Sequence, residues 1–233
     1  SPGKKTVAVV ELVGEIMDTK DVVAKLYEQA YNANVDGIVL RIDSPGGAVG
    51  PSQDVYSAVQ KLKERKPIIA SMGAVAASGG LYSSLAASKV YAQQGTLTGS
   101  IGVIMQVPNF TKVTEKVGVE MITVKSGELK DVGNPFRPFT QNDKNLLEGT
   151  INSTYDQFVK AVSDGRNIPI EKVKEFADGR ILTGVQAKEL NLIDSFGNIY
   201  DAARAVYEIK GETLKDDEMP QLFYPSDKFG PIR

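Results

Sequence analysis

Short apolar runs rich in β-branched residues alternate with helical segments over the first ninety residues, and this alternation limits the folds open to the chain. Strands are expected at residues 5–12, 37–42, 67–72 and 89–92, with helices at residues 18–33 and 51–64. The runs at 37–42 and 67–72 are largely apolar, which is typical of strands buried on both faces. The sequence therefore predicts an α/β fold in which parallel strands are joined by helical crossovers.

The rest of the chain has a mainly helical pattern. Residues 109–116 predict a short helix, residues 119–124 a strand, and residues 126–139 an irregular loop with two prolines. A long amphipathic helix is expected at residues 142–162, followed by shorter helices around 170–176, 184–190 and 199–207. Without internal repeats, we expect a single α/β domain at residues 1–209, its helical C-terminal part beginning at about 141, and a partly extended tail at 210–233.

The composition excludes most of the usual catalytic groups, because the 233 residues include no histidine and no cysteine. A Ser-His-Asp triad needs an imidazole, and zinc sites are built mainly from these two residue types. A carboxylate-only magnesium or calcium site stays open, but the chain has no EF-hand loop and no P-loop, so we expect no metal and no cofactor. An enzyme built on this chain must take its general base from lysine, aspartate, glutamate or tyrosine.

Charge and hydropathy indicate whether a nucleic acid or a membrane is an expected partner. The net charge is −2 and the basic residues are scattered among acidic ones, so no nucleic-acid partner is expected. No stretch of 18 uncharged apolar residues spans a membrane, and residues 1–5 lack the apolar core of a signal peptide. We expect this chain to be soluble as it stands, with any membrane anchor lying outside it.

Two glycine-bearing turns, at residues 43–47 and 77–80, follow predicted strands. Ligands of α/β sheets bind beyond the carboxyl ends of the strands, where these turns are expected to meet. Gly46 or Gly47, together with Gly79, would offer two backbone N–H donors to a developing oxyanion, and Ser78 would be a nucleophile beside them. Close packing is the competing explanation for small residues at such a junction.

A serine nucleophile without histidine needs another base, and a desolvated lysine is the available choice. The reference pKa of lysine is about 10.4, so a lysine base near pH 7 to 8 requires a depression of about 3 units. Ser78 is followed three residues later by Leu81, so there is no Ser-x-x-Lys motif. The residues alone leave Lys89, Lys125 and Lys130 open.

Five ordered motifs carry a family resemblance. They are DSPGG at 43–47, AASGGLY at 76–82, LTGSIGV at 97–103, GELKD at 127–131, and DGR at 178–180 followed by Thr183-Gly184 and Ala187. From about Lys5 to Tyr207 the chain resembles signal peptide peptidase A. The resemblance implies a Clp protease/crotonase-like fold and a Ser/Lys dyad, with Ser78 as nucleophile and Lys130 as general base. It also implies that Ser100 hydrogen-bonds the lysine amine and that Gly46 and Gly79 form the oxyanion hole.

The same resemblance implies a substrate and an assembly. The family cleaves remnant signal peptides in or beside bacterial membranes, so a membrane-associated protein at the extracytoplasmic face is expected. Its short members form ring-like or dome-like homo-oligomers in which the serine and lysine of one site come from adjacent protomers. Three alternatives stay open: a related membrane-associated Ser/Lys protease that cuts stomatin-like partners, a crotonase-type acyl-CoA enzyme, and a non-enzymatic scaffold.

Overall fold

The computed structural model describes residues 3–229, and its centre is a mostly parallel sheet. Its main path runs β6-β5-β3-β2-β1-β8, and β4 pairs with β3 and β7. The strands are β1 (Thr6–Val13), β2 (Gly37–Ser44), β3 (Ile68–Ala76), β4 (Lys89–Ala92), β5 (Leu97–Gly99), β6 (Ile181–Thr183), β7 (Ser195–Phe196) and β8 (Gln221–Phe223). Only β5 and β6 pair antiparallel among these strands. The predicted α/β fold with parallel central strands is confirmed.

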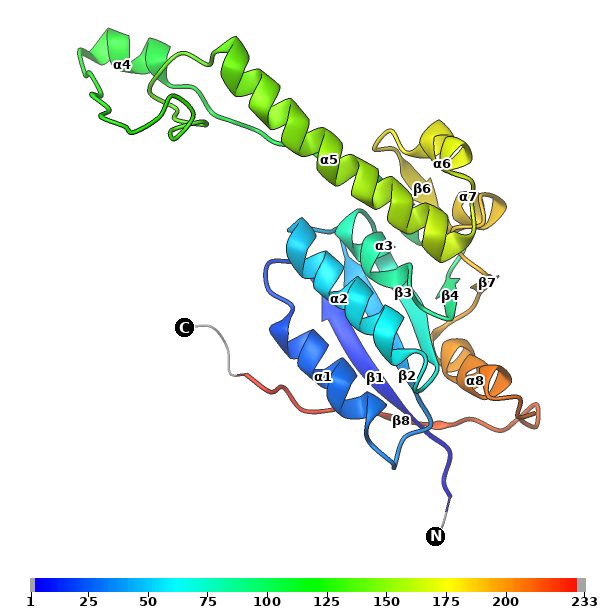
Figure 1. Ribbon diagram of the computed structural model, residues 1–233. Helices are drawn as coiled ribbons and strands as arrows, with labels where there is room; N and C mark the ends of the chain where they lie inside the picture. The colour runs from blue at the N-terminus through cyan, green and yellow to red at the C-terminus, as the bar shows by residue number, and fades with distance from the viewer. Residues whose placement is uncertain (1–2, 230–233) are drawn as a thin grey trace. The chain divides into compact units, whose positions relative to one another are not determined.

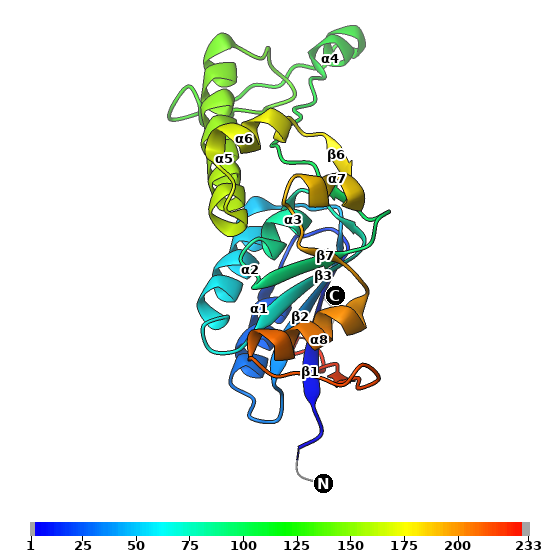
Figure 2. The ribbon, with the colours of Figure 1, turned by 90° about the vertical axis from the view of Figure 1, so that its right-hand side faces the viewer.

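Helices cover both faces of the central strands. The helices α1 (Lys20–Ala30), α2 (Val49–Leu62) and α3 (Gly79–Ser84) lie on one face, and α8 (Ile199–Ile209) lies on the other (Figures 1 and 2). The helix α8 packs on Val7, Val39 and Ile69, which occupy the same face of β1, β2 and β3. Because side chains alternate between the two faces of a strand, apolar residues on both faces allow two helical layers to bury this sheet.

The described chain divides into two compact units. The first, here called the sheet unit, contains residues 3–102 and 158–229. The second, here called the inserted unit, is Val103–Gln157. It contains α4 (Thr111–Val117) and the beginning of α5 (Gln141–Arg166), whose last residues belong to the sheet unit. The single domain over residues 1–209 stays a prediction.

The other helices of the sheet unit follow α5 in sequence. They are α6 (Ile170–Phe176) and α7 (Gly184–Glu189), close to their predicted positions. A capping box begins α7, where the Thr183 side chain accepts a hydrogen bond from the Gln186 N–H. Among the described residues, no helix combines the length and apolar character needed to cross a membrane.

The predicted strand at residues 119–124 is wrong. This segment of the inserted unit forms no strand, and its apolar side chains are exposed, up to 83% for Ile122 and 95% for Val124. A strand needs a neighbour to receive its backbone hydrogen bonds, and this segment has no strand partner within residues 3–229. A β-branched pattern alone therefore did not identify a sheet strand here.

Candidate active site

Ser78 lies in a strained turn between β3 and α3. Its φ of 54° and ψ of −119° lie outside the regions that a residue with a side chain normally adopts. Two backbone hydrogen bonds hold this conformation: the Ser78 N–H donates to the Gly99 carbonyl at 2.9 Å, and the Ser78 carbonyl accepts from the Tyr82 N–H at 2.9 Å. Strain of this kind persists only where the surroundings enforce it, and it is concentrated at functional sites.

The glycine turn after β2 touches the Ser78 turn. Gly46 has a φ of 104°, and a Cβ atom at this position would lie 2.9 Å from both the Gly79 nitrogen and the Ser78 Cβ. Any side chain at Gly46 would therefore collide with the Ser78–Gly79 turn. The structure brings Gly46, Ser78 and Gly79 together, as expected for turns at the ends of neighbouring parallel strands.

The backbone pairing around Gly47 determines which N–H groups of the glycine turn are already hydrogen-bonded. Ile16 forms a parallel bridge with Gly47, in which the Ile16 N–H donates to the Gly46 carbonyl and the Ala48 N–H donates to the Ile16 carbonyl. In a regular parallel bridge of this kind, the N–H of the middle residue, here Gly47, is not used in bonding the partner Ile16. The Gly46 N–H instead donates to the Ser44 Oγ at 3.1 Å.

Gly79 supplies a second N–H at the same place. It is the first residue of α3, and the N–H groups of the first helical turn have no acceptor within the helix. No acceptor for the N–H of Gly47 or Gly79 is found within residues 3–229. Two N–H groups on neighbouring turns are thus available to bind an oxyanion beside Ser78.

Ser100 lies directly after β5 and is held by the DGR motif. Its φ is 52°, its N–H donates to the Arg180 carbonyl at 2.8 Å, and the Gly179 N–H donates to the Ile101 carbonyl at 3.1 Å. The Arg180 guanidinium hydrogen-bonds the Asp178 carboxylate at 2.6 Å and lowers the pKa of Asp178 to about 2. Because the Gly99 carbonyl accepts a hydrogen bond from the Ser78 N–H, the backbone connects Ser100 to the Ser78 turn.

The three candidate lysines differ in their partners. Lys89 pairs with Glu208 at 3.0 Å, and this hydrogen bond raises the pKa of Lys89, which is unfavourable for a general base. The Lys125 ammonium pairs with Asp131 at 2.7 Å. Lys130 is exposed in the inserted unit, and its ammonium has no hydrogen-bond or ion-pair partner in the part of the chain that the structure describes.

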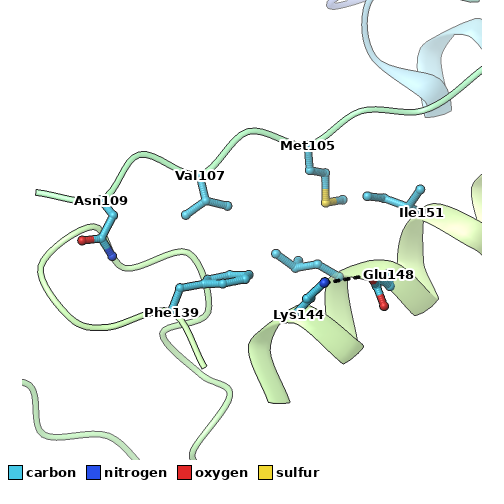
Figure 3. A pocket seen from close by; sticks show the side chains of 8 residues that line it. Met105, Val107, Asn109, Phe139, Lys144, Glu148 and Ile151 are labelled. Atoms are coloured by element: carbon cyan, nitrogen blue, oxygen red, sulfur yellow. Dashed lines mark ion pairs between the residues drawn. The ribbon is translucent and has the colours of Figure 1, made fainter. Parts of the chain in front are cut away.

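The inserted unit contains an apolar groove of about 370 Å³. Figure 3 shows Met105 and Val107 on one side of it, Phe139 on another, and an ion pair between Lys144 and Glu148 at 3.7 Å. The groove is mainly apolar, and its polar groups lie along α5 and at Asn109. Within residues 3–229, no cluster of three or more carboxylates could hold a metal ion.

Comparison with known proteins gives a family. The sequence profile of peptidase family S49 matches residues 60–212. A Synechocystis protein that is provisionally named as a protease is 40% identical over 209 residues, which cover 89% of this chain and 76% of that protein. An Enterococcus faecium protein provisionally named signal peptide peptidase A is 40% identical over 169 residues, which cover 72% of this chain and 49% of that protein.

Comparison with solved structures gives the fold. A mutant of ClpP1 from Listeria monocytogenes superposes with a TM-score of 0.59 and 16% sequence identity, covering 84% of this chain and 94% of that one. At this identity the likeness concerns the fold alone, and it confirms the predicted Clp protease-like architecture. The sequence matches identify the family, and they favour a peptidase over an acyl-CoA enzyme. The chain belongs to peptidase family S49 and is a serine peptidase.

Proposed function

We propose that the chain is the catalytic part of a Ser/Lys endopeptidase that hydrolyses remnant signal peptides or other apolar peptides through an acyl-enzyme. The observation that carries the proposal is the contact between the Gly46 turn and the strained Ser78–Gly79 turn. This contact provides a nucleophile and two N–H groups at one place, which is the arrangement that acyl transfer requires.

The mechanism uses Ser78 as nucleophile. Its Oγ attacks the peptide carbonyl carbon while its proton passes to the neutral amine of Lys130, and the carbonyl oxygen becomes an oxyanion bound by the N–H groups of Gly79 and Gly47. The C–N bond then breaks, the leaving amine takes the proton from the lysine, and water hydrolyses the ester by the reverse proton path. Gly47 is better placed than Gly46 as the second donor, because the Gly46 N–H already donates to Ser44.

The assignment of the base has two supports. The resemblance selects Lys130, with Ser100 holding its amine, and the ion pairs of Lys89 and Lys125 make these two lysines less suitable as a base. A base also has to lose its proton before it can accept one, which an ion pair with a carboxylate opposes. Lys130 is thus preferred, and because it is exposed in the single chain, we propose that a neighbouring protomer provides the burial that a lysine base requires.

A homo-oligomer is part of the proposal, since the inserted unit leaves its apolar side chains uncovered. Within Val103–Gln157 only Asp143 is fully buried, whereas many large apolar side chains are exposed. Soluble proteins rarely leave so much apolar surface in contact with water. We propose that neighbouring copies of the chain cover this surface and that Ser78 and Lys130 of one site come from adjacent protomers, in a ring or dome.

The substrate class follows from the groove and the family. An apolar groove lined by Met105, Val107 and Phe139 suits an apolar peptide such as the core of a signal peptide. Such peptides remain in the membrane after secretion, so we propose that the protein works beside the membrane, at its extracytoplasmic face.

Covalent labelling tests this function. The purified protein is treated with a fluorophosphonate and digested, and mass spectrometry is expected to find one adduct, on Ser78. The Ser78→Ala variant should form none, while Ser84→Ala, which removes another serine hydroxyl a few residues away, should be labelled normally. An adduct elsewhere, or none on active protein, would contradict the proposal. Cleavage of stomatin-like segments in preference to signal peptides would favour the related protease instead.

A further inference from the structure

Ser44 joins the two turns of the candidate site. It is the last residue of β2, and none of its surface is exposed. Its carbonyl oxygen accepts a hydrogen bond from the Ala77 N–H at 3.1 Å, and its hydroxyl oxygen accepts one from the Gly46 N–H at 3.1 Å. Ser44 therefore contacts the Ser78 turn through its backbone and the glycine turn at Gly46 and Gly47 through its side chain.

The backbone of Ser44 is held independently of its hydroxyl. Ser44 pairs with Ala76 of β3 after a register shift that begins at Ile42. The backbone also packs closely against α3, because a Cβ on Gly80 would lie 2.7 Å from the Ser44 carbonyl oxygen. Removing the hydroxyl should therefore leave the strand and the Ser78 turn in place and affect mainly the Gly46 N–H.

The glycine turn needs such a restraint. Gly46 and Gly47 have φ values of 104° and 155°, and glycine is the residue with the greatest backbone freedom. Ile16 holds the Gly46 carbonyl and the Ala48 N–H on one side of the turn. On the other side, the Ser44 hydroxyl is the group that holds the Gly46 N–H.

We propose that Ser44 is a positioning residue for the oxyanion hole. By binding the Gly46 N–H, its hydroxyl keeps the peptide group between Gly46 and Gly47 in one orientation. In this orientation the Gly47 N–H faces the substrate carbonyl oxygen that becomes negatively charged. This inference rests on the proposed acyl-transfer function. Oxyanion donors act by being correctly placed before the reaction, and a small misplacement can lower the rate about 100-fold.

Kinetics of Ser44→Ala test the role. We expect kcat to fall about 10- to 100-fold while KM changes less than about threefold, because the donor acts on the transition state and not on the bound substrate. A peptide aldehyde forms a tetrahedral adduct with Ser78, and its Ki should rise by the same factor as kcat falls. The affinity for a product peptide should stay unchanged. A purely structural role would not change kcat and the aldehyde Ki while leaving KM and the product affinity nearly unchanged.

Matched variants complete the test. Ser84→Ala also loses a buried hydroxyl, one that donates to the Leu81 carbonyl at 2.7 Å, and it should keep kcat within about twofold. Ser44→Thr retains the oxygen and should retain activity. If Ser44→Ala does not fold, Ser44→Cys, with a sulfur that accepts hydrogen bonds weakly, should show an intermediate loss of kcat.

Two results would separate the failure of this inference from that of the function. In the first result, fluorophosphonate labels Ser78 of the wild-type protein, but the folded Ser44→Ala variant hydrolyses peptides at the wild-type rate. The positioning role is then wrong and the peptidase function stands. Ser44→Cys replaces Ser44→Ala in this test if the alanine variant does not fold. If Ser78 is not labelled in active wild-type protein, the proposed function fails. A loss of kcat in Ser84→Ala as large as in Ser44→Ala would also overturn the role of Ser44.

Discussion

The sheet unit and the inserted unit are stabilised in different ways. In the sheet unit, β1, β2 and β3 consist largely of side chains with no exposed surface, such as Val39 and Ile69. In the inserted unit Asp143, at 1% exposed, is the buried exception among side chains that contact water. Apolar burial is the main favourable term in folding, so the first unit has its own source of stability and the second has little.

Ion pairs connect the loop of the inserted unit to the start of α5. The Arg137 guanidinium donates to Asp131 at 3.0 Å and to Asp143 at 2.9 Å. These bonds hold the pKa values of both carboxyls well below their ordinary range. The proposed nucleophile therefore lies in a unit with a buried apolar core, whereas the proposed base lies in a unit held mainly by ion pairs.

The largest effect should come from the two proposed catalytic side chains, one in each unit. Ser78→Ala and Lys130→Ala should each lower peptide hydrolysis by about 10⁴-fold or more, because removing a nucleophile or its base stops acyl transfer. Circular dichroism and sedimentation should show an unchanged fold and oligomer. Full activity in either variant would remove that residue from the mechanism.

Mixing the two inactive variants sharpens the same prediction. If one site takes its serine and lysine from different protomers, mixed oligomers contain some intact sites and part of the activity should return. Absence of recovery after subunit exchange has been verified would show that each protomer supplies its own pair.

The rate of hydrolysis should rise with pH, since the base has to be a neutral amine. The rate at saturating substrate should therefore be lower at pH 6 than at alkaline pH. The measurement is kcat between pH 6 and 10, with circular dichroism to confirm that the protein stays folded. A flat profile would exclude a titrating lysine.

Truncation of one isoleucine in each unit tests their different stability. Ile69→Ala in β3 should lower the free energy of unfolding by about 2–5 kcal/mol, because it leaves a cavity in a fully buried site. Ile122→Ala, at a side chain that is largely exposed, should change it by less than about 0.5 kcal/mol. Urea denaturation measures both. Ile122→Ala should instead weaken the proposed oligomer, and a large loss of monomer stability in this variant would contradict the comparison.

Acid should open the inserted unit, as the smallest of the expected effects. The folded-state pKa values of Asp131 and Asp143 are lowered, so their stabilisation is present above the unfolded value of about 3.9 and is lost as the pH falls below it. Hydrogen exchange at pH 6 and 3, corrected for intrinsic rates, should show protection lost at residues 131–143 before it is lost in β2. Asp143→Asn should weaken this protection already at pH 6, unlike Asp156→Asn, its exposed control on α5. Equal protection at both pH values would contradict this role of the ion pairs.

Local sequence patterns predicted much of the sheet unit correctly. The apolar runs at residues 37–42 and 67–72 correspond to β2 and β3, and the glycine turns after them meet as expected. The same reasoning failed at residues 119–124. An apolar β-branched pattern indicates that a segment can form a strand, but it does not indicate whether a neighbouring strand is present to pair with it. The two- and three-residue strands β5 to β8 were too short to predict individually.

The sequence by itself determined that this chain has no histidine or cysteine chemistry, and it correctly predicted parallel central strands and a buried strand before Ser78. These properties depend on composition and on neighbours along the chain. Only the tertiary structure decided that the Gly46 N–H is held by Ser44 and that Lys89 and Lys125 are paired. Lys89 and its partner Glu208 are distant in sequence, and even a pair as near as Ser44 and Gly46 depends on the direction in which a turn bends. Folding in three dimensions is what brings these groups into contact.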